Sequence, residues 1–272
     1  MALEDTNSRI VLPSGEVWSE IYRDGGDYVL DWKRTACFRV ARDGSRARCK
    51  AYPSASPTSV SVLKDLAKAY ADSLHGHESI HATALIPPGA SWAVAFLGDS
   101  GAGKSTLSAH LVRRDWGLLS DDALSLSCHR GSVWVSSRAQ RLKLGEESLK
   151  SVGWKRSSAA FDPNLEKWVF SLPENMGNYP LRALFLLSRD KSEIPRLARV
   201  QGAEAVIALQ AGFYNLLLRP RRVLHRQFDL AARLARAVPI WKLSYPSGLR
   251  HLPKVCGFLG SFLNGFHADP SY

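Results

Sequence analysis

The sequence predicts an α/β protein in which a mixed sheet flanked by helices follows a small β-rich N-terminal part. Short strand-like segments fill the first 52 residues, and residues 79–120 give the order strand, glycine-rich loop, helix and strand. Alternation of strands with helical segments is typical of a sheet covered by helices. We expect a β-rich region with one helix over residues 1–76 and a larger domain over residues 77–272.

The N-terminal region reads as short strands followed by one helix. "DYVLDW" (27–32) predicts a strand, and "ACFRVARDGSRARCKAY" (36–52) predicts a hairpin that turns around Asp43-Gly44. A Ser/Pro-rich loop follows, and "VSVLKDLAKAYADSL" (60–74) then carries apolar residues at helical spacing. We place a boundary near residues 75–78.

The cysteines predict no disulfide and no zinc site. The chain has 4 of them, at positions 37, 49, 128 and 256, without a C-x-x-C pair. With a tight turn at Asp43-Gly44, Cys37 lies opposite Lys50 and Cys49 lies one pair further on, so the two sulfurs face different sides of the sheet. We expect four free, buried cysteines of a reducing compartment.

The larger domain opens with a strand at "SIHATAL" (79–85) and a second at "SWAVAFLG" (91–98). The helix pattern after the glycine-rich loop contains Leu107, Leu111 and Trp116, with Gly117 as its predicted stop. "LLS" then leads into a pair of aspartates.

Three further elements follow along the chain. "ALSLSCHRGSVWVSS" (123–137) predicts a hairpin turning at Arg130-Gly131, and "LRALFLLS" (181–188) predicts an apolar strand. The spacing of apolar residues predicts a helix from Gln227 to Ala237, with Arg233 and Arg236 on its solvent side.

The loop "LGDSGAGKSTL" (97–107) fits the phosphate-binding pattern G-x-x-x-x-G-K-[ST]. Glycines let consecutive backbone amides point at phosphate oxygens, and the following helix adds its positive end. In such loops the lysine reaches the β- and γ-phosphates and the serine hydroxyl binds Mg²⁺. The predicted nucleotide-binding residues are Gly98, Asp99, Ser100, Gly101, Ala102, Gly103, Lys104, Ser105 and Thr106.

Asp121 and Asp122 close the strand that follows the helix of this loop. Beside a bound nucleotide and Mg²⁺, one carboxylate would hold the metal and the other would accept a proton from an attacking hydroxyl. We take Ser105 and Asp122 as the candidate metal ligands. The alternative is a turn or helix cap that contains two acids.

Together, "IHATAL…GDSGAGKSTLSAHLVRRDWGLLSDDALSL" resembles the catalytic core of the HPr kinase/phosphorylase superfamily, most strongly over residues 79–127 and more weakly to about 253. The resemblance implies a P-loop (HPr-kinase-like) core that uses ATP and Mg²⁺. It implies catalytic roles for four residues: Lys104 at the phosphates, Asp121 as the base for a serine hydroxyl, Asp122 in support of that base or of the metal, and His81 orienting the pair.

The segment after the core differs from the pattern of that family. After the core, that family has a Leu-Arg-Gly-x-Gly segment tied to its reverse reaction, whereas this chain reads "RAQRLKLGEESLKSVG". The missing glycines count against phosphorylase activity and against HPr as the substrate. The chain is more similar to the stand-alone HPr-kinase-like proteins that accompany ribosomally made peptides, including lasso peptides. Similarity to that group implies a serine kinase. Its acceptor would be a serine of a precursor peptide, often near the C-terminus of that peptide, or more broadly a serine of a peptide or small protein.

Basic residues supply further candidates. Arg141 and Lys167 fall where smaller relatives carry cations near the phosphates, and Arg219 belongs to a basic segment that could hold a carboxylate or phosphate. A plain surface cation is the alternative for each.

Composition excludes several classes of function. The net charge of +11 comes without a nucleic-acid-reading signature, and no run of about 18 apolar residues predicts a membrane span. The start lacks the pattern of a secretory signal, so we expect a cytoplasmic protein without nucleic-acid or membrane partners. A small-molecule kinase and a nucleotide-dependent binding module remain alternatives, and a homo-oligomer stays open.

Overall fold

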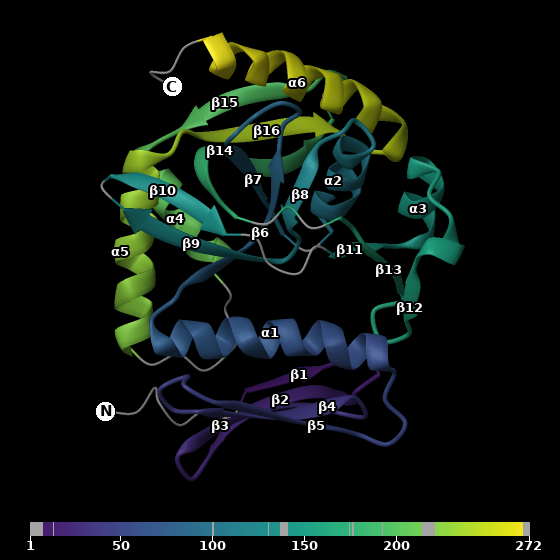
Figure 1. The fold of residues 1–272 in the computed structure, drawn as a ribbon, viewed down its shortest axis with the longest axis vertical. Helices are drawn as coiled ribbons and strands as arrows, with labels where there is room; N and C mark the ends of the chain where they lie inside the picture. Colours follow the sequence, from purple (N-terminus) through teal and green to yellow (C-terminus); the bar gives the residue numbers. More distant parts are fainter. Residues whose placement is uncertain are drawn as a thin grey trace.

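A long helix, α1 (Pro57–His75), lies between a small N-terminal sheet and the larger remainder of the chain in a computed structural model (Figure 1). The structure describes residues 8–12, 14–99, 101–129, 131–136, 141–173, 175, 177–191, 193–213 and 221–268. None of the described helices combines the length with the apolar character that a membrane crossing demands.

The N-terminal sheet is an antiparallel meander in the order β1-β2-β3-β4-β5. Alternate side chains of these strands, such as Leu30 and Phe38, pack against Leu63 and Tyr70 of α1. The sheet therefore buries one face under the helix. Its strands are β1 (Ser8–Val11), β2 (Val17–Asp24), β3 (Asp27–Trp32), β4 (Ala36–Ala41) and β5 (Ala47–Ala51).

The hairpin of β4 and β5 has the predicted register, with Cys37 opposite Lys50 and Phe38 opposite Cys49. All four cysteines are free, as expected. The prediction that all four are buried was wrong, because Cys49 lies on an edge strand whose residues are all exposed and Cys128 is exposed as well. Only Cys256 is buried, within the main core.

Gly44 carries the turn of this hairpin against the end of α1, with φ of 78°. A Cβ there would lie 2.0 Å from the carbonyl oxygen of Ala71 and 2.7 Å from the amide nitrogen of His75. We expect Gly44→Ala to lower the free energy of unfolding by about 3 kcal/mol, since left-handed backbone costs about 1–2 kcal/mol and overpacking adds about 1–3. Gly25→Ala, with φ of 60° and nothing within 4 Å, should cost about 1 kcal/mol. Urea denaturation measures both variants. If Gly44→Ala and Gly25→Ala lowered the free energy of unfolding equally, the packing argument for Gly44 would be contradicted.

The main sheet is mixed and runs β10-β9-β6-β7-β14-β16-β15, with β8 beside β6 and a further pairing between β10 and β14. Strands β7, β14 and β16 are parallel neighbours, and the others pair antiparallel. The strands are β6 (Ser79–Ile86), β7 (Ala93–Leu97), β8 (Gly117–Ser120), β9 (Ala123–His129), β10 (Ser132–Ser136), β14 (Asn178–Asp190), β15 (Arg196–Val200) and β16 (Ile240–Pro246).

Helices cover both faces of the main sheet, and a small antiparallel sheet, β11-β13-β12, lies beside it (Figure 1). The small sheet consists of β11 (Arg141–Leu144), β12 (Ala160–Asp162) and β13 (Lys167–Ser171). The remaining helices are α2 (Lys104–Val112), α3 (Glu146–Val152), α4 (Gly202–Gly212), α5 (Arg221–Ala237) and α6 (Leu252–Ala268), with short 3₁₀ turns at Arg156–Ser158 and Leu249–His251.

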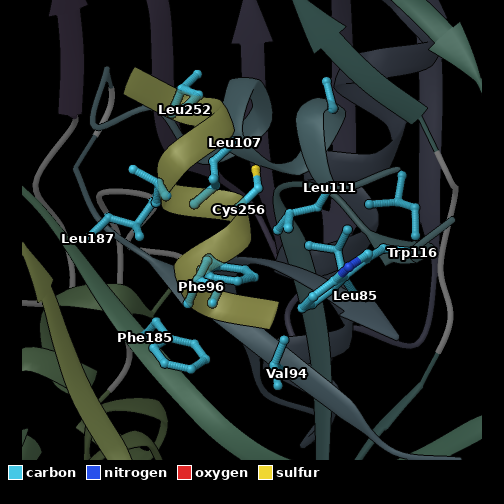
Figure 2. Close-up of a cluster of buried hydrophobic side chains, with 14 of the residues drawn as sticks. Leu85, Val94, Phe96, Leu107, Leu111, Trp116, Phe185, Leu187, Leu252 and Cys256 are labelled. Atoms are coloured by element: carbon cyan, nitrogen blue, oxygen red, sulfur yellow. The ribbon is translucent and has the colours of Figure 1, made fainter. Parts of the chain in front are cut away.

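Strand β7 is buried on both faces, as is typical of an unbroken apolar strand inside a sheet with parallel neighbours. Val94 and Phe96 face the cluster that contains α2 and α6, where Phe96 stacks on Phe185 (Figure 2). Ala95 and Leu97 face the cluster on the other side, with α4 and α5. This packing fixes the end of β7, from which the glycine-rich loop leaves the sheet.

The predicted hairpin of β9 and β10 and the apolar strand β14 are confirmed, although Arg130 of the hairpin turn lies outside the described residues. The predicted end of the loop's helix at Gly117 was wrong. Helix α2 ends at Val112, Asp115 takes φ of 64°, and Gly117 opens β8. Trp116 still packs with Leu111 in the core, because the turn brings it back against the helix.

Helix α5 is longer than predicted and begins at Arg221 rather than Gln227. Arg233 and Arg236 are exposed, as expected. Arg226 forms an ion pair with the buried carboxylate of Glu78 at 2.6 Å, and Ser73 of α1 donates a hydrogen bond to the same carboxylate. These contacts join α5, α1 and the start of β6.

Candidate active site

The glycine-rich loop connects β7 to α2 and has the backbone that an anion cradle needs. Gly101 and Gly103 take φ of 82° and 100°, a left-handed conformation that glycine adopts without strain. The loop ends at the N-terminus of α2, where unpaired amides and the helix dipole favour an anion. Ser100, one of the predicted nucleotide contacts, lies outside the described residues.

Lys104 opens α2 and folds back over the loop. Its ammonium donates hydrogen bonds to the carbonyls of Gly98 at 2.6 Å and Asp99 at 3.3 Å. Burial lowers the pKa of Lys104. A negatively charged ligand at the loop would restore a favourable environment for this charge, because an opposite charge nearby favours the charged form.

Asp121 and Asp122 occupy a break between two strands that both pair with β6. Ser120 at the end of β8 lies opposite Ala84, and Ala123 at the start of β9 lies opposite His81. The chain therefore bulges out of the sheet at the two aspartates. Asp122 takes φ of 83°, an uncommon conformation for a residue other than glycine that tends to cluster at functional sites.

The carboxylate of Asp121 lies beside the loop. It accepts a hydrogen bond from the Thr83 hydroxyl at 2.7 Å, and the Ser105 hydroxyl lies 3.2 Å from each of its oxygens. Asp121 is buried, with a relative exposure of 8%. The aspartate pair, 17 residues after Lys104 in the sequence (121 − 104), is thus joined directly to the serine of the phosphate-binding pattern.

Asp122 faces two basic side chains. It forms an ion pair with Lys143 of β11, and the Nε2 of His81 lies 3.5 Å from its Oδ1. Burial lowers the pKa of Lys143. The sequence reasoning missed this lysine and named its neighbour Arg141. The alternating sequence "RLKL" could have indicated Lys143, since residues two apart in a strand share a face with each other.

His81 is held in its neutral form. Desolvation and the charge of Lys104 lower the pKa of His81 from 6.5 to about 4, although 39% of its side chain is exposed. Because the folded-state pKa is the lower one, any stability linked to His81 is present above pH 6.5 and is lost as the pH falls towards 4.

We expect an NMR titration of the histidine rings to place the midpoint of His81 near 4 in the nucleotide-free protein. The resonance is assigned by its absence in His81→Gln. A midpoint near 6.5 would contradict this environment and would make the histidine a charged partner of Asp122 at pH 6.

Arg189 and Tyr245 support the loop from the neighbouring parallel strands. The Tyr245 hydroxyl donates to the Ala102 carbonyl at 2.7 Å, and both this hydroxyl and the Arg189 guanidinium border Gly103. A Cβ on Gly103 would lie 2.6 Å from the Arg189 guanidinium, so this cation borders the loop. The predicted strand 181–188 stops one residue before it. Strand order could have predicted both residues, because the carboxyl ends of neighbouring parallel strands meet at one edge of a sheet.

The other predicted basic residues have different positions. Arg141 donates a hydrogen bond to Ser61 at 2.7 Å and is ion-paired with Asp65, both on α1. Lys167 opens β13 and lines a cavity together with Ser105. Arg219 lies outside the described residues. Lys167 therefore lines the same cavity as Ser105 of the loop, whereas Arg141 lines a neighbouring cleft.

Two adjoining cavities open at the aspartate pair. The larger, about 570 Å³, lies between α1 and strands β8 to β10 and is lined by both aspartates. The smaller, about 230 Å³, is lined by Ser105, His81 and Lys167 and extends to the N-terminal sheet. Asp122, Lys143, Val62 and Leu66 line both, so the two spaces meet at the Asp122–Lys143 pair.

The residues here suit Mg²⁺ that is bound together with phosphates. No cluster of three or more His, Cys, Asp or Glu side chains that could hold a metal is found in the described part of the chain. Mg²⁺ commonly takes one or two protein oxygens and completes its shell with substrate phosphates and water. The Ser105 hydroxyl, the Asp121 carboxylate beside it and Asp122 in the same cavity as Ser105 supply such oxygens.

Comparisons with known proteins give little beyond this geometry. No protein-family model matches the chain, and no curated protein matches its sequence. The solved structures that match include the Hpr(Ser) kinase/phosphatase from Coxiella burnetii, at 11% sequence identity over 71% of this chain and 99% of that chain, with a TM-score of 0.36. At this TM-score the likeness carries no weight for function, which must follow from the chain's own residues.

Proposed function

We propose that this protein is an ATP-dependent kinase that transfers the γ-phosphoryl group to a serine hydroxyl of a peptide or small protein. The observation that carries the proposal is the position of Asp121. Its carboxylate is hydrogen-bonded to Ser105 of the glycine-rich loop and also lines the cleft of about 570 Å³ beside α1. One acid thus connects a phosphate-binding loop with a space for an acceptor.

We assign the base to Asp121, the acid that contacts the serine of the loop and lines the acceptor cleft. Its partners Thr83 and Ser105 are uncharged hydroxyls, whereas Asp122 is paired with Lys143. The ion pair occupies the Asp122 carboxylate, whereas the Asp121 carboxylate faces the loop and the acceptor cleft. We therefore keep Asp121 as the base and assign to Asp122 the positioning of Lys143 and His81.

The transfer balances with these groups. The serine oxygen attacks the γ-phosphorus, the bond from that phosphorus to the bridging β,γ-oxygen breaks, and ADP leaves with the bond's electron pair. The hydroxyl proton passes to Asp121. Lys104 and the amides of the loop hold the phosphates, and Lys143 and Lys167 lie on the side of the smaller cavity, where they can neutralise equatorial oxygens.

Ser105 and Asp122 would hold Mg²⁺, whose positive charge would offset the negative charge of the phosphates when the metal is bound. Positioning by the loop, with the aspartate aimed at the hydroxyl, supplies the rest of the catalysis.

A small-molecule kinase is the second candidate, because the larger cavity has a volume within the range of about 300–1,000 Å³ that is typical of small-ligand sites. The cleft also suits an extended chain, since it runs along α1 from Val62 to Asp72. The resemblance noted in the sequence favours the peptide, and its narrower form is a precursor peptide with a serine near its C-terminus.

The test incubates the full chain with Mg·ATP and either serine peptides, some ending in serine, or a set of small hydroxyl compounds, and measures intact masses. Addition of one phosphoryl group to a serine peptide, with stoichiometric ADP, is the expected result. Transfer only to small compounds supports the second candidate. Nucleotide binding without any transfer supports a binding module and overturns the proposal.

A further inference from the structure

The smaller cavity has an apolar end that the chemistry of phosphoryl transfer does not use. Beyond Ser105, His81 and Lys167, it is lined by Trp18 and Trp32 of the N-terminal sheet, with Leu63, Leu66 and Leu165 beside them. Trp32 and Leu63 are buried, while Trp18 and Leu165 are half-buried. An aromatic and aliphatic pocket therefore adjoins the reacting groups.

The pocket brings together three separate segments of the chain. Trp18 and Trp32 come from β2 and β3, Leu63 comes from α1, and Leu165 comes from the turn between β12 and β13. Asn164 of that turn donates a hydrogen bond to Thr35 at 2.7 Å, and Ser59 of α1 donates to Asp162 at 2.6 Å. These bonds hold the turn against the N-terminal sheet and α1, so the walls of the pocket are fixed.

Size and continuity indicate what would fill it. The whole cavity of about 230 Å³ is already below the range of about 300–1,000 Å³ that holds a whole small ligand. Its apolar end is only a part of that volume, so it suits no more than one side chain. The pocket meets the larger cleft at Asp122 and Lys143, next to the place where an acceptor hydroxyl would lie. A chain in the larger cleft can therefore present its hydroxyl to Asp121 and insert a neighbouring side chain here.

We propose that the N-terminal sheet, α1 and the β12–β13 turn form a specificity subsite for one apolar side chain, aromatic or leucine-sized, next to the phosphorylated serine. This assignment rests on the proposed kinase function and makes the acceptor a peptide with an apolar residue adjacent to the serine. Burial of one such side chain raises kcat/KM by about tenfold or more, since it contributes about 1.5–3 kcal/mol to transition-state binding.

The test uses the full chain, Mg·ATP and synthetic Gly-rich peptides with one serine. Phe, Leu, Gly or Asp is placed immediately before or after that serine, and kcat/KM is measured from phosphopeptide mass. We expect Phe or Leu on one side to exceed Gly about tenfold or more, and Asp to be the poorest. Leu165→Asp should remove this preference while the Gly peptide keeps its rate within about threefold, because Leu165 lines only the apolar end.

Leu224→Asp is the matched control, because Leu224 is an exposed leucine on α5 outside both cavities. Trp18→Leu is the second pocket variant, which should shift the preference from Phe towards smaller side chains even if Leu165→Asp folds poorly. Equal rates for Phe, Leu and Gly in the wild type, or an unchanged preference in both pocket variants, overturn the subsite and leave the kinase standing. Absence of transfer to every peptide overturns the proposed peptide kinase and the subsite with it.

Discussion

Asp121→Asn should lower the rate of phosphoryl transfer by about 10²- to 10⁴-fold, the range for loss of a general base. Asparagine keeps the shape of the side chain and an oxygen that can accept the hydrogen bond of Thr83, now 2.7 Å long. The amide cannot take up the proton of the acceptor hydroxyl. Affinity for Mg·ATP should stay within a few-fold, because the loop and Lys104 are unchanged. Single-turnover kinetics and nucleotide titration measure the two effects separately.

Asp122→Asn is the comparison for that variant. It breaks the ion pair with Lys143, whose burial already lowers its pKa, so the lysine should lose charge more readily. We expect a smaller fall in transfer than for Asp121→Asn, together with a changed pH profile. A larger fall for Asp122→Asn, with near wild-type transfer in Asp121→Asn, would exchange the roles of the two acids.

Lys104→Ala should weaken the binding of Mg·ATP by about 10- to 100-fold, because a hydrogen bond from a charged group contributes about 1.5–3 kcal/mol. Transfer should fall further, since the same ammonium would stabilise charge on the phosphates in the transition state. The fold should be retained, because the folded protein already disfavours this buried charge and its pKa is lowered. Calorimetric titration and a thermal melt test both parts.

Lys254→Ala is a suitable control, since Lys254 is an exposed lysine on α6 that lines neither cavity. Loss of binding in both variants would indicate a general effect of net charge on the anionic nucleotide. Loss in Lys104→Ala with an equally large drop in melting temperature would indicate that the lysine supports the fold and would contradict its assignment to the phosphates.

Local patterns in the sequence predicted the elements that carry the site. The apolar run 91–98 predicted a strand, which the structure has at Ala93–Leu97. The glycines and Lys104 predicted the loop and the start of a helix, and Asp43-Gly44 predicted a hairpin in the correct register. These features depend on neighbouring residues, because the turn fixes the register and the side-chain period fixes the buried face. The predicted helix end at Gly117 was wrong, because α2 ends at Val112 and the chain turns through Asp115, with φ of 64°, before Gly117 opens β8.

The tertiary structure alone decided which distant residues meet. Lys143 reaches Asp122, Thr83 reaches Asp121, and Trp18 and Trp32 reach the cavity of Ser105, across separations that no local pattern encodes. Strand pairing brings β8 and β9 onto β6 and places the aspartate pair in the break between them. Helix α1 lies between this part of the chain and the N-terminal sheet (Figure 1). The sequence by itself determined a strand, a phosphate-type loop and two adjacent acids. Long-range pairing and the burial of α1 determined what faces them, because both depend on surfaces that exist only once the chain has folded.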